Sequence, residues 1–198
     1  MKRMAFIIIT AILVIAVAIY TYLGGFSNLN IRTENIGGEA VVYKEITGNY
    51  NNLTPVTDEI YYYLLNELNI ETYKGFGIFY DNPQQVEKDK LRADAGCIIE
   101  AKDIDCLKSI DSKYKFKTLP IEKSVVAELP YRGNISILFG FIKVFPAIDK
   151  YRKEHNLNDG PLMSIADVPN KKIIYRKVVK EAGDKYTGEV RSNPIQIK

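Results

Sequence analysis

The sequence repeats itself once, and this repeat limits the possible folds more than any other feature. Three short motifs recur after 84, 85 and 86 residues. They are Val41-Val42 with Val125-Val126, Gly48-Asn49 with Gly133-Asn134, and Asp81-Asn82-Pro83 with Asp167-Val168-Pro169. A solenoid needs at least three repeats to bury a continuous core. Two copies therefore predict one domain with a pseudo-two-fold axis.

Each copy carries the same order of elements: strand, helix, strand, strand. Runs of β-branched and aromatic residues predict the strands, over residues 39–46, 76–80, 96–100, 125–129, 162–166 and 172–179. Apolar residues at spacings of three and four predict the two helices, over 54–69 and 134–155. We therefore predict an α+β domain in which duplicated units form an antiparallel sheet with both helices on one face.

The second helix carries two distinctive features. Its apolar residues at helical spacing predict one buried stripe, made of Leu138, Phe141, Ile142, Phe145 and Ile148. Pro146 lies inside the same pattern, where its missing N–H group and its ring should kink or split the helix. We expect this helix to lie on the sheet, because it cannot bury its stripe alone.

The N-terminus carries an apolar segment. Ala5 to Leu23 is nineteen residues without a charge, about the length that spans a hydrocarbon core as a helix. A cleaved signal peptide is the alternative, although its apolar core is usually shorter and ends in a small-residue cleavage site. Lys2 and Arg3 precede the segment, so the positive-inside rule predicts an extracytoplasmic domain. A domain that faces the cytosol is the alternative.

These patterns divide the chain into four parts. We predict a transmembrane anchor over 1–24, a polar linker over 25–38, the duplicated domain over 39–180 and a polar tail over 181–198. Within the domain, the two units cover about 39–101 and 119–180.

Charge and composition argue against several functions. The net charge is +3, and without Lys2 and Arg3 it is +1, from 25 basic and 24 acidic residues. A nucleic-acid-binding protein usually has a basic face, so we expect no nucleic-acid partner. The single histidine argues against a metal site, and no motif points to a cofactor. Cys97 and Cys106 allow one disulfide, or Cys97 is a small core residue.

Short motifs with consistent spacings run through both copies. They are Tyr80-Asp81-Asn82-Pro83, Asp89-Lys90 with Arg92, Gly96, Leu129-Pro130-Tyr131, and Pro146-Ala147-Ile148-Asp149 with Tyr151, Lys153, Glu154 and Leu157. In these motifs, and in its duplicated order of elements, the chain resembles the GyrI-like (bacterial transcription activator effector-binding) family over 39–179. The likeness is stronger to a membrane-anchored branch that includes a testis-expressed ER-phagy receptor.

Two features depart from that receptor. Its long tail carries an autophagy-protein motif, whereas residues 181–198 contain no aromatic residue followed three positions later by Leu, Ile or Val. Its domain faces the cytosol, whereas Lys2 and Arg3 predict the opposite orientation here. The resemblance therefore implies the fold and not the autophagy role.

The resemblance also implies a ligand site between the two units, on the open sheet face, lined by aromatic and acidic residues. Such a site suits a small apolar or cationic ligand or a peptide, since rings and a carboxylate attract cations. The candidate residues are Tyr43, Glu45, Phe76, Tyr80, Glu128, Tyr131 and Tyr175. Ordinary sheet packing or a solvated strand position is the alternative for each of them.

Two other functions remain open. Some relatives are hydrolases that use a pocket glutamate, and Glu128 is the candidate catalytic residue, because a raised pKa would let it act as a general base. A membrane-tethered interaction scaffold, with protein partners and no ligand, is the third reading. A closed cleft with a buried Glu45 or Glu128 would favour a binder or an enzyme, and a filled cleft would favour the scaffold.

Overall fold

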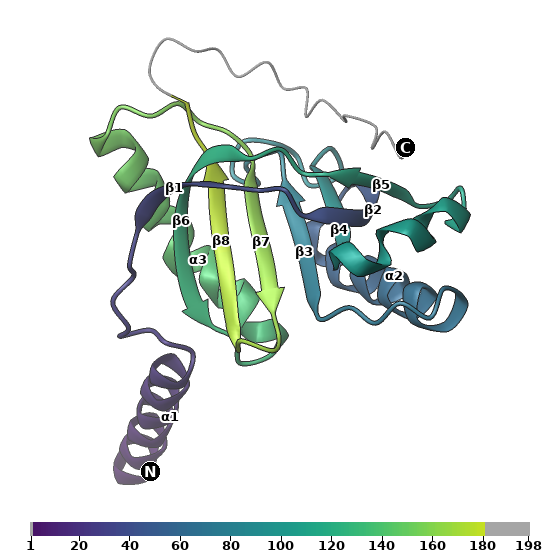
Figure 1. Ribbon diagram of the computed structural model, residues 1–198. Coiled ribbons are helices and arrows are strands. Elements are labelled where there is room, and N and C mark those ends of the chain that lie inside the picture. The colour runs from purple at the N-terminus through teal and green to yellow at the C-terminus, as the bar shows by residue number, and fades with distance from the viewer. Residues whose placement is uncertain (1, 181–198) are drawn as a thin grey trace.

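The computed structural model describes residues 2–180, apart from the side chains of Lys108, Ser109 and Leu138, so the predicted tail over 181–198 lies outside the described residues. An N-terminal helix precedes an α+β domain built on one antiparallel sheet of eight strands (Figure 1). The predicted fold class is confirmed. In chain order, the elements are α1 (Lys2–Tyr22), β1 (Arg32–Ile36), β2 (Ala40–Thr47), the 3-10 helix η1 (Tyr50–Asn52), α2 (Leu53–Glu67), β3 (Lys74–Phe79), β4 (Arg92–Ile99), the 3-10 helix η2 (Ala101–Ser109), β5 (Lys115–Thr118), β6 (Glu122–Pro130), α3 (Asn134–Glu154), β7 (Leu162–Asp167) and β8 (Lys172–Val178).

The duplication appears in the sheet as a pseudo-two-fold axis. The strand order is β1-β6-β8-β7-β3-β4-β2-β5, so the two copies meet where β3 pairs with β7. The three central pairs are Gly77 opposite Ser164, Phe76 opposite Ile165, and Ile78 opposite Met163. A rotation about the Gly77–Ser164 pair exchanges the other two pairs, which places the axis there.

The strand register shows that the valine motifs of the two copies are equivalent at a separation of 83 residues, and not at the 84 residues between the matching letters. Val42 and Val125 both lie on the side of the sheet that packs against the helices, whereas Val41 lies on the opposite side. The equivalent positions are therefore 42 and 125, and 125 − 42 gives a separation of 83. Because successive side chains of a strand point to opposite faces, an error of one residue assigns a side chain to the wrong face.

The two copies exchange their edge strands. β1 precedes the first copy in the chain but pairs with β6 of the second, and β5 precedes the second copy but pairs with β2 of the first. The connections that follow β1 and β5 meet, and the Gly38 N–H donates to the Leu119 carbonyl at 2.8 Å. The Leu119 N–H in turn donates to the Glu39 carbonyl at 2.9 Å.

The expectation of a polar linker over 25–38 is therefore wrong for residues 32–36, which form β1. The six predicted strands also leave out both edge strands of the sheet, β1 and β5. The sequences of the edge strands, RTENI and KFKT, are short and charged. Edge strands often carry charges that oppose further strand pairing. For that reason these two segments lack the alternating apolar pattern that reveals an inner strand.

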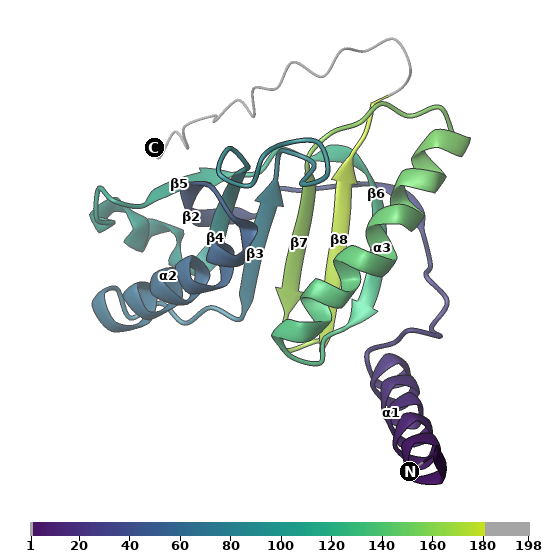
Figure 2. The same cartoon turned by 180° about the vertical axis from the view of Figure 1, so that it is seen from behind.

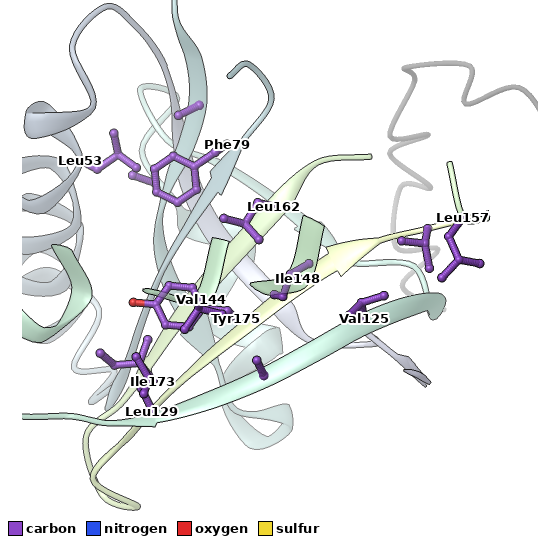
Figure 3. Close-up of a cluster of buried hydrophobic side chains, with 14 residues drawn as sticks. Leu53, Phe79, Val125, Leu129, Val144, Ile148, Leu157, Leu162, Ile173 and Tyr175 are labelled. Carbon is purple, nitrogen blue, oxygen red and sulfur yellow. The ribbon is translucent and has the colours of Figure 1, made fainter. Parts of the chain in front are cut away.

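α2 and α3 cover the same face of the sheet (Figure 2). α2 buries Ile60 and Leu64 completely, as the helical spacing predicts. α3 buries Val144 and Ile148 against β6 and β8 (Figure 3). Full burial of one such side chain stabilises the fold by roughly 1.5–3 kcal/mol, which explains why α2 and α3 lie on the sheet.

The predicted stripe of α3 needs one correction. The helix continues through Pro146, so of the two predicted outcomes, a kink or a split, the split does not occur. Ile142 is 71% exposed, whereas its neighbours Phe141 and Phe145 pack against the core. Leu138 lies among the side chains that are not described. Only part of the apolar surface of α3 therefore faces the sheet.

α1 is long and apolar enough to cross a membrane, by length and composition. Its mean hydropathy reaches 2.7 over an 18-residue window, and none of its residues is buried. A signal sequence has the same properties, so the helix supports both readings of the N-terminus.

Candidate ligand-binding site

Side chains that point away from α2 and α3 form an apolar cluster on the other face of the sheet, which we call the open face. The cluster extends over strands of both copies, across the axis between β3 and β7. Its buried members are Val41, Tyr43, Phe76, Ile78, Ile98, Leu119, Met163 and Ile165. Leu119 belongs to the connection between β5 and β6, so this connection fills part of the open face.

An ion pair between Asp94 and Lys117 is buried beside this cluster. Lys117 Nζ lies 2.7 Å from Asp94 Oδ2, and the two side chains are 5% and 4% exposed. The Tyr80 hydroxyl donates a second hydrogen bond to Asp94 Oδ2, also at 2.7 Å. The Lys117 ammonium lies 4.1 Å from the centroid of the Tyr43 ring. A carboxylate and an aromatic ring thus hold one cation between them.

The surroundings of this ion pair are strongly desolvated. Burial raises the pKa of Tyr43 to about 12, and the negative charges of Asp94 and Glu45 add to this effect. Removing two charges from water costs several kcal/mol for each ion, and mutual attraction often fails to offset that cost. A buried ion pair is therefore weak evidence for stability, and buried charges often mark functional sites.

Sequence reasoning missed both partners of this pair. Asp94 lies in β4, whose sequence RADAGCII is otherwise mostly small or apolar beyond its first residue. A charge in such a run needs a partner, and the same signal had pointed to Glu128. Lys117 carried no comparable signal, because the sequence does not reveal β5 as a strand.

Glu128 lies on the open face of the second copy and has two cationic partners. Arg32 Nη2 donates to its Oε1 at 2.9 Å, and Lys172 Nζ donates to its Oε2 at 3.2 Å. The hydrogen bond from Arg32, followed by that from Lys172, holds the pKa of Glu128 below its usual range although burial opposes this. The side chain is 33% exposed. Glu128 is therefore held ionised near the surface.

Glu45 occupies a similar position in the first copy. It lies on the same side of β2 as Tyr43 and forms an ion pair of 2.7 Å with Lys115 of β5. Its side chain is exposed. Neither Glu45 nor Glu128 is thus a buried carboxylate, whereas Asp94 is.

The aromatic candidates fall into two groups. Tyr43, Phe76 and Tyr80 come together on the open face. Tyr175 and Tyr131 pack on the helix side instead. Tyr175 is fully buried opposite Ala127, and its hydroxyl donates to the Ile137 carbonyl of α3 at 2.8 Å. Figure 3 shows Tyr175 within the cluster of buried side chains on this side.

The cysteines do not form a disulfide with each other. Cys97 is buried on the helix side of β4, where burial raises the pKa of its thiol to about 12, and Cys106 lies at the surface. Among residues 2–180, no group of three or more His, Cys, Asp or Glu residues could hold a metal ion. The candidate site therefore rests on Asp94, Lys117 and the aromatic residues beside them.

No known protein-family model matches the chain. Two curated relatives are similar in sequence: testis-expressed protein 264 of Homo sapiens and its homologue in Mus musculus. Each is 32% identical over 124 residues, which is 60% of this chain. The match covers 39% of the human protein and 40% of the mouse protein, so it spans about two fifths of each relative.

Solved structures resemble the fold at much lower identity. The structure of EcmrR in its complex with DNA matches 91% of this chain and 69% of its own chain, with a TM-score of 0.57 and 8% identity. SAV2435 bound to tetraphenylphosphonium matches 76% of this chain and 94% of its own, with a TM-score of 0.50 and 13% identity. At these identities the likeness shows that the fold is shared, and it carries nothing about activity.

These likenesses leave two expectations untested. EcmrR is seen with DNA, so the absence of a nucleic-acid partner here stays a prediction from charge alone. The membrane side on which the domain lies is likewise a prediction from Lys2 and Arg3.

Proposed function

We propose that the chain is a membrane-tethered binding module that holds a small organic cation on its open face, at Asp94. The observation that carries this proposal is the position of Lys117. Its ammonium group is buried between the Asp94 carboxylate and the Tyr43 ring, at 2.7 Å and 4.1 Å. In this arrangement the protein's own side chain occupies a cation site, and the ligand takes its place.

The neighbouring groups suit an organic cation rather than a metal ion. Tyr43, Phe76 and Tyr80 supply aromatic surface, and Asp94 supplies the charge that fixes the cationic centre. An aromatic face attracts a desolvated cation by about 2 kcal/mol. SAV2435, which has a similar fold, is seen with tetraphenylphosphonium, an aromatic cation.

Lys117 sits where local opening can release it. It lies in β5, a strand of four residues that pairs only with β2 at the edge of the sheet. Short edge elements open at low free energy compared with the central strands. Ligand entry therefore needs the displacement of one side chain at an edge and no change in the central strands.

Thermal denaturation of the full chain in detergent, with tetraphenylphosphonium added, tests the site. We expect a small rise in Tm for the wild type and a larger one for Lys117→Ala, because this variant vacates the cation position while Asp94 remains. Tetraphenylborate, of the same shape and opposite charge, should raise neither Tm. A ligand that binds only the native state stabilises it by RT ln(1 + L/Kd), where L is the ligand concentration, so tighter binding at the same ligand concentration gives a larger rise in Tm.

A variant without either charge completes this test. Asp94→Asn combined with Lys117→Met removes the pair together, so no buried charge is left alone, and we expect it to fold and not respond to tetraphenylphosphonium. If Lys117→Ala responds no more strongly than the wild type, the site at Asp94 is wrong.

The proposed tether is supported by the length and composition of α1, and its proposed orientation by the residues that open this helix. Lys2 and Arg3 favour a domain outside the cytoplasm. A membrane-impermeant maleimide added to intact cells should then label Cys106, which is exposed, and leave the buried Cys97 unlabelled. Labelling only after lysis would instead support a domain that faces the cytosol, and a shortened mature chain would support a cleaved signal peptide.

A scaffold without a small ligand is the second candidate. The open face is already partly covered by Leu119 and by the ion pair of Arg176 with Glu39, at 2.8 and 3.0 Å. The hydrolase reading has less support, because a general base benefits from a raised pKa and that of Glu128 is lowered. Absence of any Tm change with tetraphenylphosphonium in every variant would favour the scaffold.

A further inference from the structure

The last turn of α1 packs directly against the start of α3. The rings of Tyr20 and Phe139 meet edge to face with 5.6 Å between their centroids, and Phe26 contacts Tyr20 in the same way at 5.0 Å. The Arg132 guanidinium lies 4.9 Å from the centroid of the Tyr22 ring. The end of the apolar helix is thus held on the domain by aromatic contacts.

Polar contacts fix the same junction. Lys143 Nζ donates to the carbonyl oxygens of Gly24 at 2.6 Å and Ser27 at 2.7 Å. Leu23 is buried, and Gly24 adopts a φ of +83°, which favours glycine, where the chain turns away from α1. Residues 23–27 therefore form a docked turn and not a loose tether.

The apolar face of α3 beside this junction has no partner in the described part of the chain. Ile135 and Ile142 are 61% and 71% exposed, and Phe26 is also exposed. Ile135 lies four residues before Phe139 and Ile142 three residues after it, so all three share one side of the helix. That side is the one that meets Tyr20 of α1.

We propose that the first half of α3 rests on the membrane surface, with lipid covering Ile135 and Ile142. This inference relies on the tether in the proposed function and is independent of the cation site. If α1 spans the bilayer, Tyr20 and Tyr22 lie at its interface, where aromatic side chains are enriched. Phe139, in contact with Tyr20, then lies at the same depth, and the two isoleucines on the same side of α3 lie beside it.

The arrangement of the domain agrees with such an orientation. Both ribbon views show α1 leaving the domain at the end of the sheet where α3 begins (Figures 1 and 2). Arg132 and Lys143 lie at the same junction, where basic side chains attract anionic headgroups. An apolar helix side flanked by basic residues is typical of a surface that lies in the membrane interface.

The absence of tryptophan from the chain gives a direct test. Single variants Ile135→Trp and Ile142→Trp of the full chain are reconstituted in phosphatidylcholine vesicles, with and without bromine on the acyl chains. We expect the brominated lipid to quench at least half of the fluorescence of both. Phe6→Trp, within α1, reports insertion itself and should also be quenched.

Ile121→Trp is the matched control for a membrane-distal position. Ile121 is 69% exposed and precedes β6, about 30 Å by strand rise from the end of that strand where α3 begins. Its fluorescence should not change with bromine. If Ile135→Trp and Ile142→Trp behave like Ile121→Trp while Phe6→Trp is quenched, the membrane surface is wrong and the tether stands.

Two other outcomes also overturn the inference. A blue-shifted emission of Ile142→Trp without quenching would show that protein, such as a second copy, covers this side of α3. Lack of quenching for Phe6→Trp would remove the tether and this surface together.

Discussion

The two copies of the repeat build the same frame on the open face and place different chemistry in it. Glu45 pairs with Lys115 at 2.7 Å in the first copy, and Glu128 pairs with Arg32 at 2.9 Å in the second. These are equivalent positions, because 128 − 45 and 115 − 32 both equal 83. Each ion pair joins an exchanged edge strand to its neighbour, so the frame is common to both halves.

The halves differ immediately beside these ion pairs. Asp94 lies opposite Glu45, whereas the position opposite Glu128 is Ile174. By the same register, Tyr43 of β2 corresponds to Val126 of β6, and Lys117 of β5 corresponds to Glu34 of β1. Figure 1 shows these two pairs of strands at opposite edges of the sheet. The second copy therefore keeps the frame without the buried Asp94–Lys117 pair, which is why the proposed function is assigned to the first copy.

The largest expected effect comes from Asp94→Asn. This change leaves the Lys117 ammonium buried without its carboxylate, and breaking a buried ion pair in this way costs about 3–5 kcal/mol. At the equivalent position of the second copy, the small apolar change Ile174→Val should cost about 0.5–1.5 kcal/mol. Denaturant unfolding of the full chain in detergent measures both losses.

The control is the variant that lacks both charges. Asp94→Asn combined with Lys117→Met should recover most of the lost stability, since no charge remains buried alone. A loss below about 1 kcal/mol for Asp94→Asn would mean that the Lys117 ammonium reaches water easily.

A smaller effect is expected at the centre of the second copy. Arg176 and Gly96 are equivalent positions, because Arg176 lies opposite Val126 and Gly96 lies opposite the equivalent Tyr43. The buried Arg176 donates to Glu39, which lies in the connection between β1 and β2. Burial is the largest single influence and would raise the pKa of Glu39, but the hydrogen bonds and the charge of Arg176, with smaller contributions from the backbone and Lys74, together lower it. Arg176→Met should cost about 2 kcal/mol, less than for a pair with both partners fully buried.

Amide hydrogen exchange locates this second effect. In Arg176→Met, protection from exchange should fall at the amides of residues 38 and 119, which donate hydrogen bonds between the connections that follow β1 and β5. Protection in β4 should stay unchanged. Exchange that increases first in β4 would place the role of Arg176 elsewhere.

The comparison of the halves also explains what sequence could reveal. The six inner strands were predictable, because strands such as Ala40–Thr47 and Lys172–Val178 pack on a core and must place apolar side chains at fixed intervals. β1 and β5 face no such requirement along most of their length. The exchange of edge strands, and with it the position of Lys117, therefore has no signature in the sequence.

The site was predictable to the same limited extent. Tyr43, Phe76 and Tyr80 share the open face as strand alternation predicts, but alternation alone does not say which face the helices cover. For this reason alternation did not separate Tyr175 from the others, although it lies opposite Ala127 on the helix side and away from the open face. Asp94 was the most detectable omission, because it is a charge within a run of small residues.

Neutralising the two equivalent glutamates should have a still smaller effect. Glu45→Gln removes one surface ion pair and Glu128→Gln removes two, and each such pair contributes about 0–1 kcal/mol. Glu128→Gln should be the more destabilising, because Glu128 has two cationic partners and is less exposed. Parallel denaturant titrations of the two variants measure the difference, and equal or reversed losses would show that Lys172 adds nothing.

The smallest effect is the pH dependence of the Glu128 contribution. Hydrogen bonds from Arg32 and Lys172 lower the pKa of Glu128 from its ordinary 4.5. A group whose pKa is lower in the folded chain stabilises the fold above its unfolded pKa, and this contribution is lost as the pH falls through the folded value. The difference in Tm between the wild type and Glu128→Gln should therefore be full at pH 7 and shrink below about pH 4. Ile174→Val carries no titrating change, so its Tm difference from the wild type should stay constant over the same range. A gap for Glu128→Gln that persists at low pH would mean that the glutamine disturbs packing at the β1–β6 edge, and that the frame shared by the two copies does not depend on this charge.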